Sequence, residues 1–264
     1  MEIIIENLSS PGAQFSKNTN EVMLKIFSWI NDNNCPKLQF IDFRRGLERD
    51  VKINDNNARN IYPLLKNSGL VEYQGGEVLD TASFFTKRGL AYINALQMIE
   101  SIEQGDYTKK QKEQALNEVN IILGKITFDS VAKLIKNDDL NYSEGLKWYI
   151  QYLTKFGKIN KEEFALMVHT MAENPNTWYD EIKENISKYR NGDVDINVKV
   201  RVRNDQKIQK STGQQTRLEG ISFFTAYTYY AALVNQAAIT RKVKDYQVIV
   251  DGMTEKLEIL FEED

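Results

Sequence analysis

The chain has 264 residues, of which 42% are hydrophobic and 27% are charged, with a formal net charge of −3. This composition excludes a disordered chain, and the length predicts two or three compact subdomains. The single cysteine, Cys35, excludes an intramolecular disulfide and a cysteine-rich zinc site. The acidic N-terminus does not resemble a signal peptide, and no apolar run approaches a membrane helix, so we expect a cytoplasmic protein without a membrane partner.

The first third of the chain predicts three helices followed by a β-hairpin. Apolar residues recur at helical spacing in 20–33, 38–51 and 54–67, and the short strands "GLVEY" and "ASFF" flank a Gly-Gly turn. A further helix begins at Thr86 and ends at Gly105. Helix, helix, helix, strand, turn, strand is the order of a winged helix, whose third helix normally enters the major groove of DNA.

The third predicted helix begins with an unusual cluster of polar residues. Asn can pair with adenine and Arg with guanine, and the first turn of a helix presents free backbone N–H groups to a phosphate. Turn formation and helix capping explain the same residues equally well. The candidate DNA contacts in this cluster are Asn54, Asn56, Asn57, Arg59 and Asn60.

The rest of the chain predicts a connector and a second helical unit. We expect residues 106–142 to form one or two connecting helices and residues 143–264 to form a second helical, winged-helix-like unit. Its predicted helices are 143–156, 160–173 and 176–190, followed by an aromatic helix at 218–237 and three short strand candidates. With 1–105 as the N-terminal winged helix, the expected fold is mostly α with small β-hairpins, arranged as tandem winged-helix-like subdomains.

A basic stretch, "INVKVRVRNDQKIQKSTGQQTR" (196–217), is the best functional lead. Its first part alternates as a strand, with valines on one face and Lys199, Arg201 and Arg203 on the other, about 7 Å apart. These cations would hold phosphates, while the polar loop that follows has residue types suited to base contacts. A solvated strand face with a mobile loop is the alternative, and we expect 204–216 to be mobile without DNA. The loop candidates are Lys207, Lys210, Gln214, Gln215 and Arg217.

The sequence lacks the motifs of several enzyme classes. It contains no phosphate-binding loop and no nucleophile elbow, and its one histidine, His169, lies in an apolar helical pattern. The nearest match to a metal-dependent nuclease is Asp42 with "Asp50-Val51-Lys52", in a region predicted to be helical rather than stranded. We therefore expect no catalytic residue, no metal and no cofactor in this chain.

The pattern resembles the DNA-recognition region of AlwI-like Type IIS restriction endonucleases and related nickases. The resemblance covers about residues 9–250 through architecture and short motifs, which are matched here by Gly157, Ile159, Asn160, Lys161 and Glu163, and then by Ile182, Tyr189 and Arg190. In that family a separate C-terminal domain carries the nuclease site. The resemblance therefore implies a recognition domain or subunit that is not catalytic by itself and has a nuclease domain or subunit as its partner.

The sequence thus predicts sequence-specific binding of double-stranded DNA, with the helix at 54–67 and the basic segment at 199–217 embracing the duplex. Three alternatives stay open. The first is a stand-alone winged-helix transcriptional regulator, with the aromatic helix 221–233 as its dimer surface. The second is a small Mg-dependent nuclease that uses Asp42, Asp50 and Lys52, and the third is a protein–protein scaffold without DNA.

Overall fold

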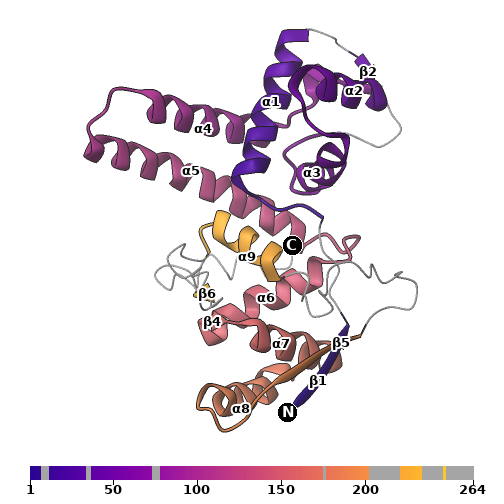
Figure 1. The fold of residues 1–264 in the computed structure, drawn as a ribbon, viewed down its shortest axis with the longest axis vertical. Coiled ribbons are helices and arrows are strands. Elements are labelled where there is room, and N and C mark those ends of the chain that lie inside the picture. The colour runs from indigo at the N-terminus through magenta and orange to yellow at the C-terminus, as the bar shows by residue number, and fades with distance from the viewer. Residues whose placement is uncertain are drawn as a thin grey trace. The chain divides into compact units, whose positions relative to one another are not determined.

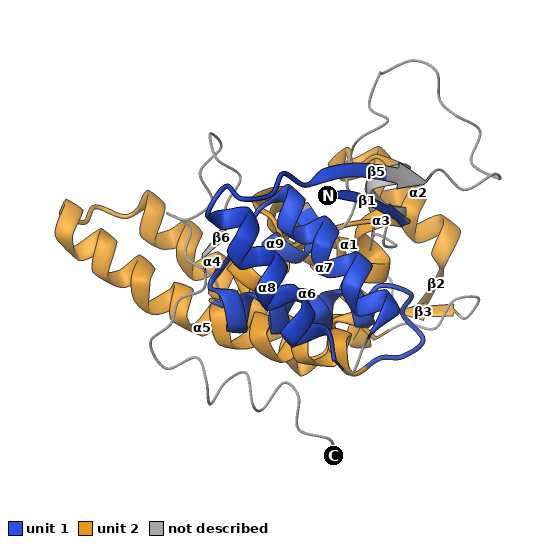
Figure 2. Cartoon of the chain, turned by 90° about the horizontal axis from the view of Figure 1, so that it is seen from below, with its two compact units in different colours: residues 1–10, 137–225, 233–264 blue, residues 11–136, 226–232 orange. Residues whose placement is uncertain are grey.

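The structure is a computed structural model, and it describes residues 1–6, 12–33, 37–72, 78–174, 177–201, 221–233 and 246–247. Helices predominate in this part of the chain, and its strands are short (Figure 1). The chain divides into two compact units (Figure 2). Residues 11–136 and 226–232 form the N-terminal unit, and residues 1–10, 137–225 and 233–264 form the C-terminal unit.

The N-terminal unit begins with three helices and two short strands. They follow one another as α1 (Lys17–Asn33), β2 (Lys37–Gln39), α2 (Phe40–Val51), α3 (Asp55–Asn67) and β3 (Val78–Asp80). β2 pairs antiparallel with β3, and an isolated bridge joins Val71 to Phe85. The 3₁₀ helix η1 (Thr81–Ser83) separates β3 from this bridge. The predicted hairpin of "GLVEY" and "ASFF" is therefore wrong in detail. Among the described residues a single bridge joins the two segments, and β3 lies where the turn was predicted.

The core of this unit is aromatic. The ring of Trp29 in α1 meets that of Phe43 in α2 edge to face at 5.5 Å, and Leu47 is fully buried beside them. The indole Nε1 of Trp29 donates a hydrogen bond of 2.9 Å to Asp50 Oδ2, which satisfies the polar atom of this buried side chain. Gly46 lies so close to the indole that a Cβ at this position would collide with the Trp29 ring.

Two long helices, α4 (Lys87–Gln104) and α5 (Lys109–Ile135), form a helical hairpin (Figure 1). Each begins at a capping threonine, because the side chains of Thr86 and Thr108 accept hydrogen bonds from the backbone of their first turns. Their shared apolar cluster contains Ala95, Ile102 and Val119. This packing places α5, which the sequence predicted to be part of a connector at 106–142, in the N-terminal unit, and the division falls after Lys136.

The C-terminal unit is built on three helices: α6 (Ser143–Phe156), α7 (Lys161–Glu173) and α8 (Trp178–Arg190). All three agree closely with the predicted ranges. α7 packs against both α6 and α8. α6 buries one apolar stripe, formed by Leu146, Tyr149, Ile150 and Leu153.

Three short strands accompany these helices. β4 (Lys158–Ile159) pairs antiparallel with β6 (Tyr246–Gln247), and β5 (Asn197–Arg201) pairs in parallel with β1 (Glu2–Glu6). β1 was not predicted. Of the three strand candidates at the C-terminal end, only the one containing 246–247 lies within the described residues.

The aromatic helix is shorter than predicted. α9 (Ile221–Tyr230) ends in a turn at Ala231–Leu233, where Ala232 has a positive φ of 55°. The division between the two units falls within this helix. None of the described helices combines the length and the apolar character needed to cross a membrane.

Candidate nucleic-acid interface

The basic strand is held by its pairing with β1. Ile3 lies opposite Val198, and Ile4 lies opposite Lys199. Ile3 and Ile5 are buried, Ile4 is 48% exposed, and Lys199 is exposed. The predicted alternation is therefore confirmed at Val198 and Lys199, which lie on opposite faces of the ladder, with the cation on the solvent side.

Lys199 is not a free cation. Its Nζ lies 2.7 Å from Glu2 Oε2, and both side chains are about half exposed. Further along the ladder Glu6 lies opposite Arg201. β1 thus brings two acidic residues to a strand that was expected to carry charge of one sign only. A phosphate at Lys199 would compete with Glu2, whose exposed ion pair with this lysine is worth at most about 1 kcal/mol.

The remaining candidates of the basic segment are described only in part. Arg201 ends β5, and its backbone alone is described. The expectations for the mobile loop 204–216 also fall outside the described residues. So do the candidate contacts beyond the strand: Arg203, Lys207, Lys210, Gln214, Gln215 and Arg217.

The polar cluster lies where it was predicted, at the start of α3. The helix begins at Asp55 and ends at Asn67, before Gly69 with a φ of +73°. Asn54 and Asn60 are both exposed. Asn56, Asn57 and Arg59 occupy the first turns by backbone position. The cluster belongs to the N-terminal unit and β5 to the C-terminal unit, so the structure describes these two parts of the predicted interface separately.

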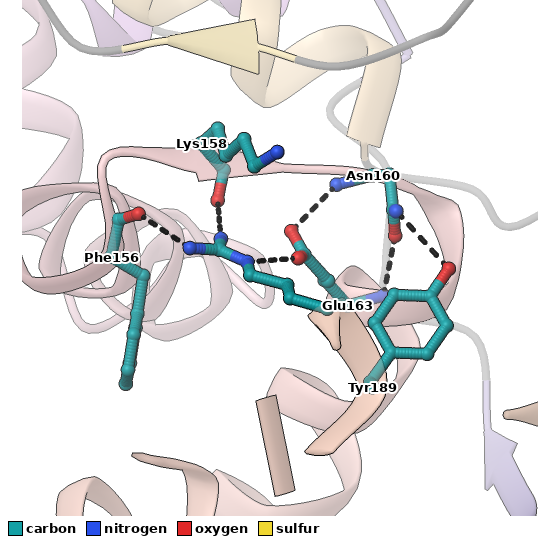
Figure 3. A network of polar contacts seen from close by, with 6 residues as sticks. Phe156, Lys158, Asn160, Glu163 and Tyr189 are labelled. Carbon is teal, nitrogen blue, oxygen red and sulfur yellow. Dashed lines mark hydrogen bonds and ion pairs between the residues drawn. The ribbon is translucent and has the colours of Figure 1, made fainter. Parts of the chain in front are cut away.

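A buried ion pair joins the helices of the C-terminal unit. Arg190 Nε, at the end of α8, donates to Glu163 Oε1 at 2.6 Å (Figure 3). The Glu163 side chain is only 2% exposed. The two other guanidinium nitrogens donate to the backbone carbonyls of Phe156 and Lys158, at 3.1 and 2.9 Å. Burial lowers the pKa of Arg190, but its bond to Glu163 and the charge of that carboxylate outweigh burial and raise it overall.

The start of α7 completes this network. Asn160 and Glu163 form a reciprocal capping box, in which each side chain accepts from the backbone N–H of the other residue. Asn160 Nδ2 also donates to the hydroxyl of Tyr189 at 3.2 Å (Figure 3). Asn160, Glu163, Tyr189 and Arg190 are all motif residues of the family resemblance. Here they lock α6, α7 and α8 together, a role that the sequence reading did not foresee.

The residues of the alternative nuclease site are engaged in other contacts. Asp42 and Asp50 lie on the same helix, α2, about 12 Å apart along its axis at 1.5 Å per residue. Asp50 accepts hydrogen bonds from Arg49 and Trp29, which lower its pKa well below the usual range. Lys52 donates to the backbone carbonyl of Arg49. The described residues contain no group of three possible metal ligands.

His169 lies in α7, as predicted. Its Nε2 is 3.6 Å from Glu173 one turn later, and its side chain is 34% exposed.

No family model, curated protein or solved structure matches this chain.

Proposed function

We propose that this chain binds double-stranded DNA in a sequence-dependent way, as the recognition domain or subunit of a restriction endonuclease, and does not itself cleave DNA. The observation that carries the proposal is the position of the polar cluster at the start of α3. Asn54 and Asn60, the cluster residues with described side chains, are exposed to solvent. In winged helices the corresponding third helix reads base edges in the major groove.

The order of elements supports a tandem winged-helix arrangement. The N-terminal unit runs α1, β2, α2, α3 and then a bridged segment at Val71, and the C-terminal unit runs α6, β4, α7, α8, β5. In each unit, the strand after the first helix pairs antiparallel with a later strand. The parallel pairing of β5 with β1 departs from the winged-helix pattern. The proposal is therefore strongest for the N-terminal unit.

The basic strand with its loop and the α3 cluster would make different kinds of contact with DNA. Lys199, Arg201 and Arg203 would contact phosphates, which fixes position without reading sequence. The α3 cluster, together with Gln214, Gln215 and Arg217, would contact bases. Because Lys199 already pairs with Glu2, DNA would gain from this lysine only the difference between a phosphate and an exposed carboxylate.

The test is a gel shift with random duplex DNA at increasing salt, followed by selection of bound sequences. The variant Asn56→Ala/Arg59→Ala should reduce the preference for the selected site by about 10-fold or more, since a good bidentate base contact gives about 1–3 kcal/mol of discrimination. The control Lys109→Ala/Lys110→Ala, at the exposed start of α5, should leave that preference unchanged.

Two results would reject the proposal. One is the absence of binding at low salt, and the other is binding whose affinity does not fall as salt rises. Cleavage of the same duplexes on addition of Mg²⁺ would support the nuclease alternative instead.

A further inference from the structure

A second basic surface lies in the C-terminal unit, around Tyr179 near the start of α8. Lys155 Nζ, from the last turn of α6, lies 5.6 Å from the centre of the Tyr179 ring. Lys183 Nζ, one turn further along α8, lies 5.8 Å from the same centre. Two cations from different helices therefore converge on one aromatic ring.

Two more aromatic rings extend this surface. Trp178 lies edge to face with Tyr179 at 5.8 Å, and Phe156 lies 5.7 Å from Tyr179. All three residues are half-buried. We call Lys155, Phe156, Trp178, Tyr179 and Lys183 the Tyr179 cluster.

Among the described contacts, the acidic residues of α8 form no ion pair with the lysines of the cluster. Glu184 pairs with Lys188 at 2.6 Å, which lowers the pKa of Glu184. Glu181 accepts a hydrogen bond from Asn174. Asp180 is exposed. Within the described part of the chain, neither Lys155 nor Lys183 has an ion-pair partner.

The cluster is also held in place. Arg190 donates to the carbonyl of Phe156, so the buried network of Figure 3 fixes the end of α6 next to α8. The Phe156 ring packs against Tyr152 at 4.7 Å on its other side. Lys155 and Tyr179 therefore lie on two helices that are fixed to each other, so less conformational entropy is lost when a ligand binds.

We propose that the Tyr179 cluster binds single-stranded nucleic acid. Lys155 and Lys183 contact the phosphates, and the Trp178 ring stacks on a base. Lysines interleaved with half-buried aromatic residues are the combination that single-strand binding requires. A duplex cannot use the rings in this way, because its bases are already stacked on one another. The cluster shares no residue with the duplex-reading segments proposed above, and the proposal does not depend on them.

The test measures fluorescence anisotropy of a labelled oligo(dT) and of a labelled duplex of the same length, with the full chain. Lys155→Ala/Lys183→Ala should weaken oligo(dT) binding at least 10-fold and reduce its salt slope by about 1.4, from two phosphate contacts at about 0.7 each. Trp178→Ala should also weaken oligo(dT) binding, and Trp178→Phe, which keeps an aromatic ring, should weaken it less. Duplex affinity should be unchanged by all three variants.

The exposed pair Lys109→Ala/Lys110→Ala is the matched control, and circular dichroism checks that each variant is folded. Wild-type oligo(dT) affinity in Lys155→Ala/Lys183→Ala would overturn the proposal, as would an equal loss in the control. Competition by inorganic polyphosphate as strong as that by oligo(dT) would also overturn it, because no base would then be recognised. Failure of duplex binding with retained oligo(dT) binding would reject only the duplex proposal.

Discussion

Replacing Arg190 by alanine should destabilise the C-terminal unit more than any other single charge deletion on α8. The guanidinium forms three hydrogen bonds, to the carboxylate of Glu163 and to the carbonyls of Phe156 and Lys158. Its removal leaves the Glu163 carboxylate buried without its cationic partner. The change therefore imposes a desolvation cost as well as the loss of the bonds themselves.

The size of the effect follows from the burial of the two partners. Removing one member of a buried ion pair costs about 3–5 kcal/mol, because the other charge stays in a poor solvent. Arg190 is 27% exposed, so water can enter the space left by its side chain and solvate part of Glu163. We therefore expect a decrease of about 3 kcal/mol in the free energy of unfolding, at the lower end of that range.

The control lies on the same helix. Lys188 pairs with Glu184 at 2.6 Å, as close as Arg190 to Glu163, but both of its side chains are mainly exposed. Lys188→Ala should change the free energy of unfolding far less than Arg190→Ala, as is typical of such helix surface pairs. The comparison tests whether burial, rather than distance, decides the strength of an ion pair.

Urea unfolding gives the free energies, and hydrogen exchange with mass spectrometry locates the change. Arg190→Ala should increase exchange in peptides from α6, α7 and α8, and leave those from α1 to α3 unchanged. The double variant Arg190→Met/Glu163→Gln should recover part of the loss, because no buried charge remains. Equal costs for Arg190→Ala and Lys188→Ala would refute the reasoning.

Two further predictions concern the N-terminal unit. The hydrogen bonds from Arg49 and Trp29 lower the pKa of Asp50 in the folded protein. The ionised Asp50 therefore stabilises the fold fully above the pKa of an unfolded aspartate, about 4, and this stabilisation is lost as the pH falls below that value. Asp50→Asn should therefore flatten the acid limb of thermal stability between about pH 4 and pH 2, and an unchanged limb would contradict this assignment. At Gly89 an added Cβ would collide with the backbone carbonyl of Leu70, so Gly89→Ala should cost about 3 kcal/mol in urea unfolding. Gly124→Ala, whose Cβ meets only the Ala232 side chain at 3.2 Å, should stay within about 1 kcal/mol of the wild type, and equal effects at the two glycines would contradict the steric argument.

The helices could be predicted because their signals are local. Capping residues such as Thr86 and Asn160, and glycines such as Gly157, mark helix ends within a few positions of the chain. The strand β1 gave no comparable signal, since "EIIIE" is a short run at the very start. It becomes a strand only through pairing with residues 197–201, almost two hundred positions later.

The candidate site, too, could be predicted only where its signal is local in the sequence. The alternation at Val198 and Lys199 is a local pattern, and the structure confirms it. The partner of Lys199 is Glu2, which no local pattern could reveal. The Tyr179 cluster was missed for the same reason, because Lys155 and Lys183 lie on different helices.

The buried network changes how the family resemblance should be weighed. Gly157 closes α6 in the left-handed conformation, Asn160 and Glu163 cap α7, and Tyr189 and Arg190 at the end of α8 bind those same two residues. Each of these five residues has a structural reason to stand where it does, because a buried glutamate needs a cation and a helix start needs a cap. Any protein that packs three helices in this way meets the same requirements, whatever it binds. The motif is therefore evidence for the arrangement of α6, α7 and α8, while the claim of DNA recognition depends on the exposed residues, the α3 cluster and the basic strand.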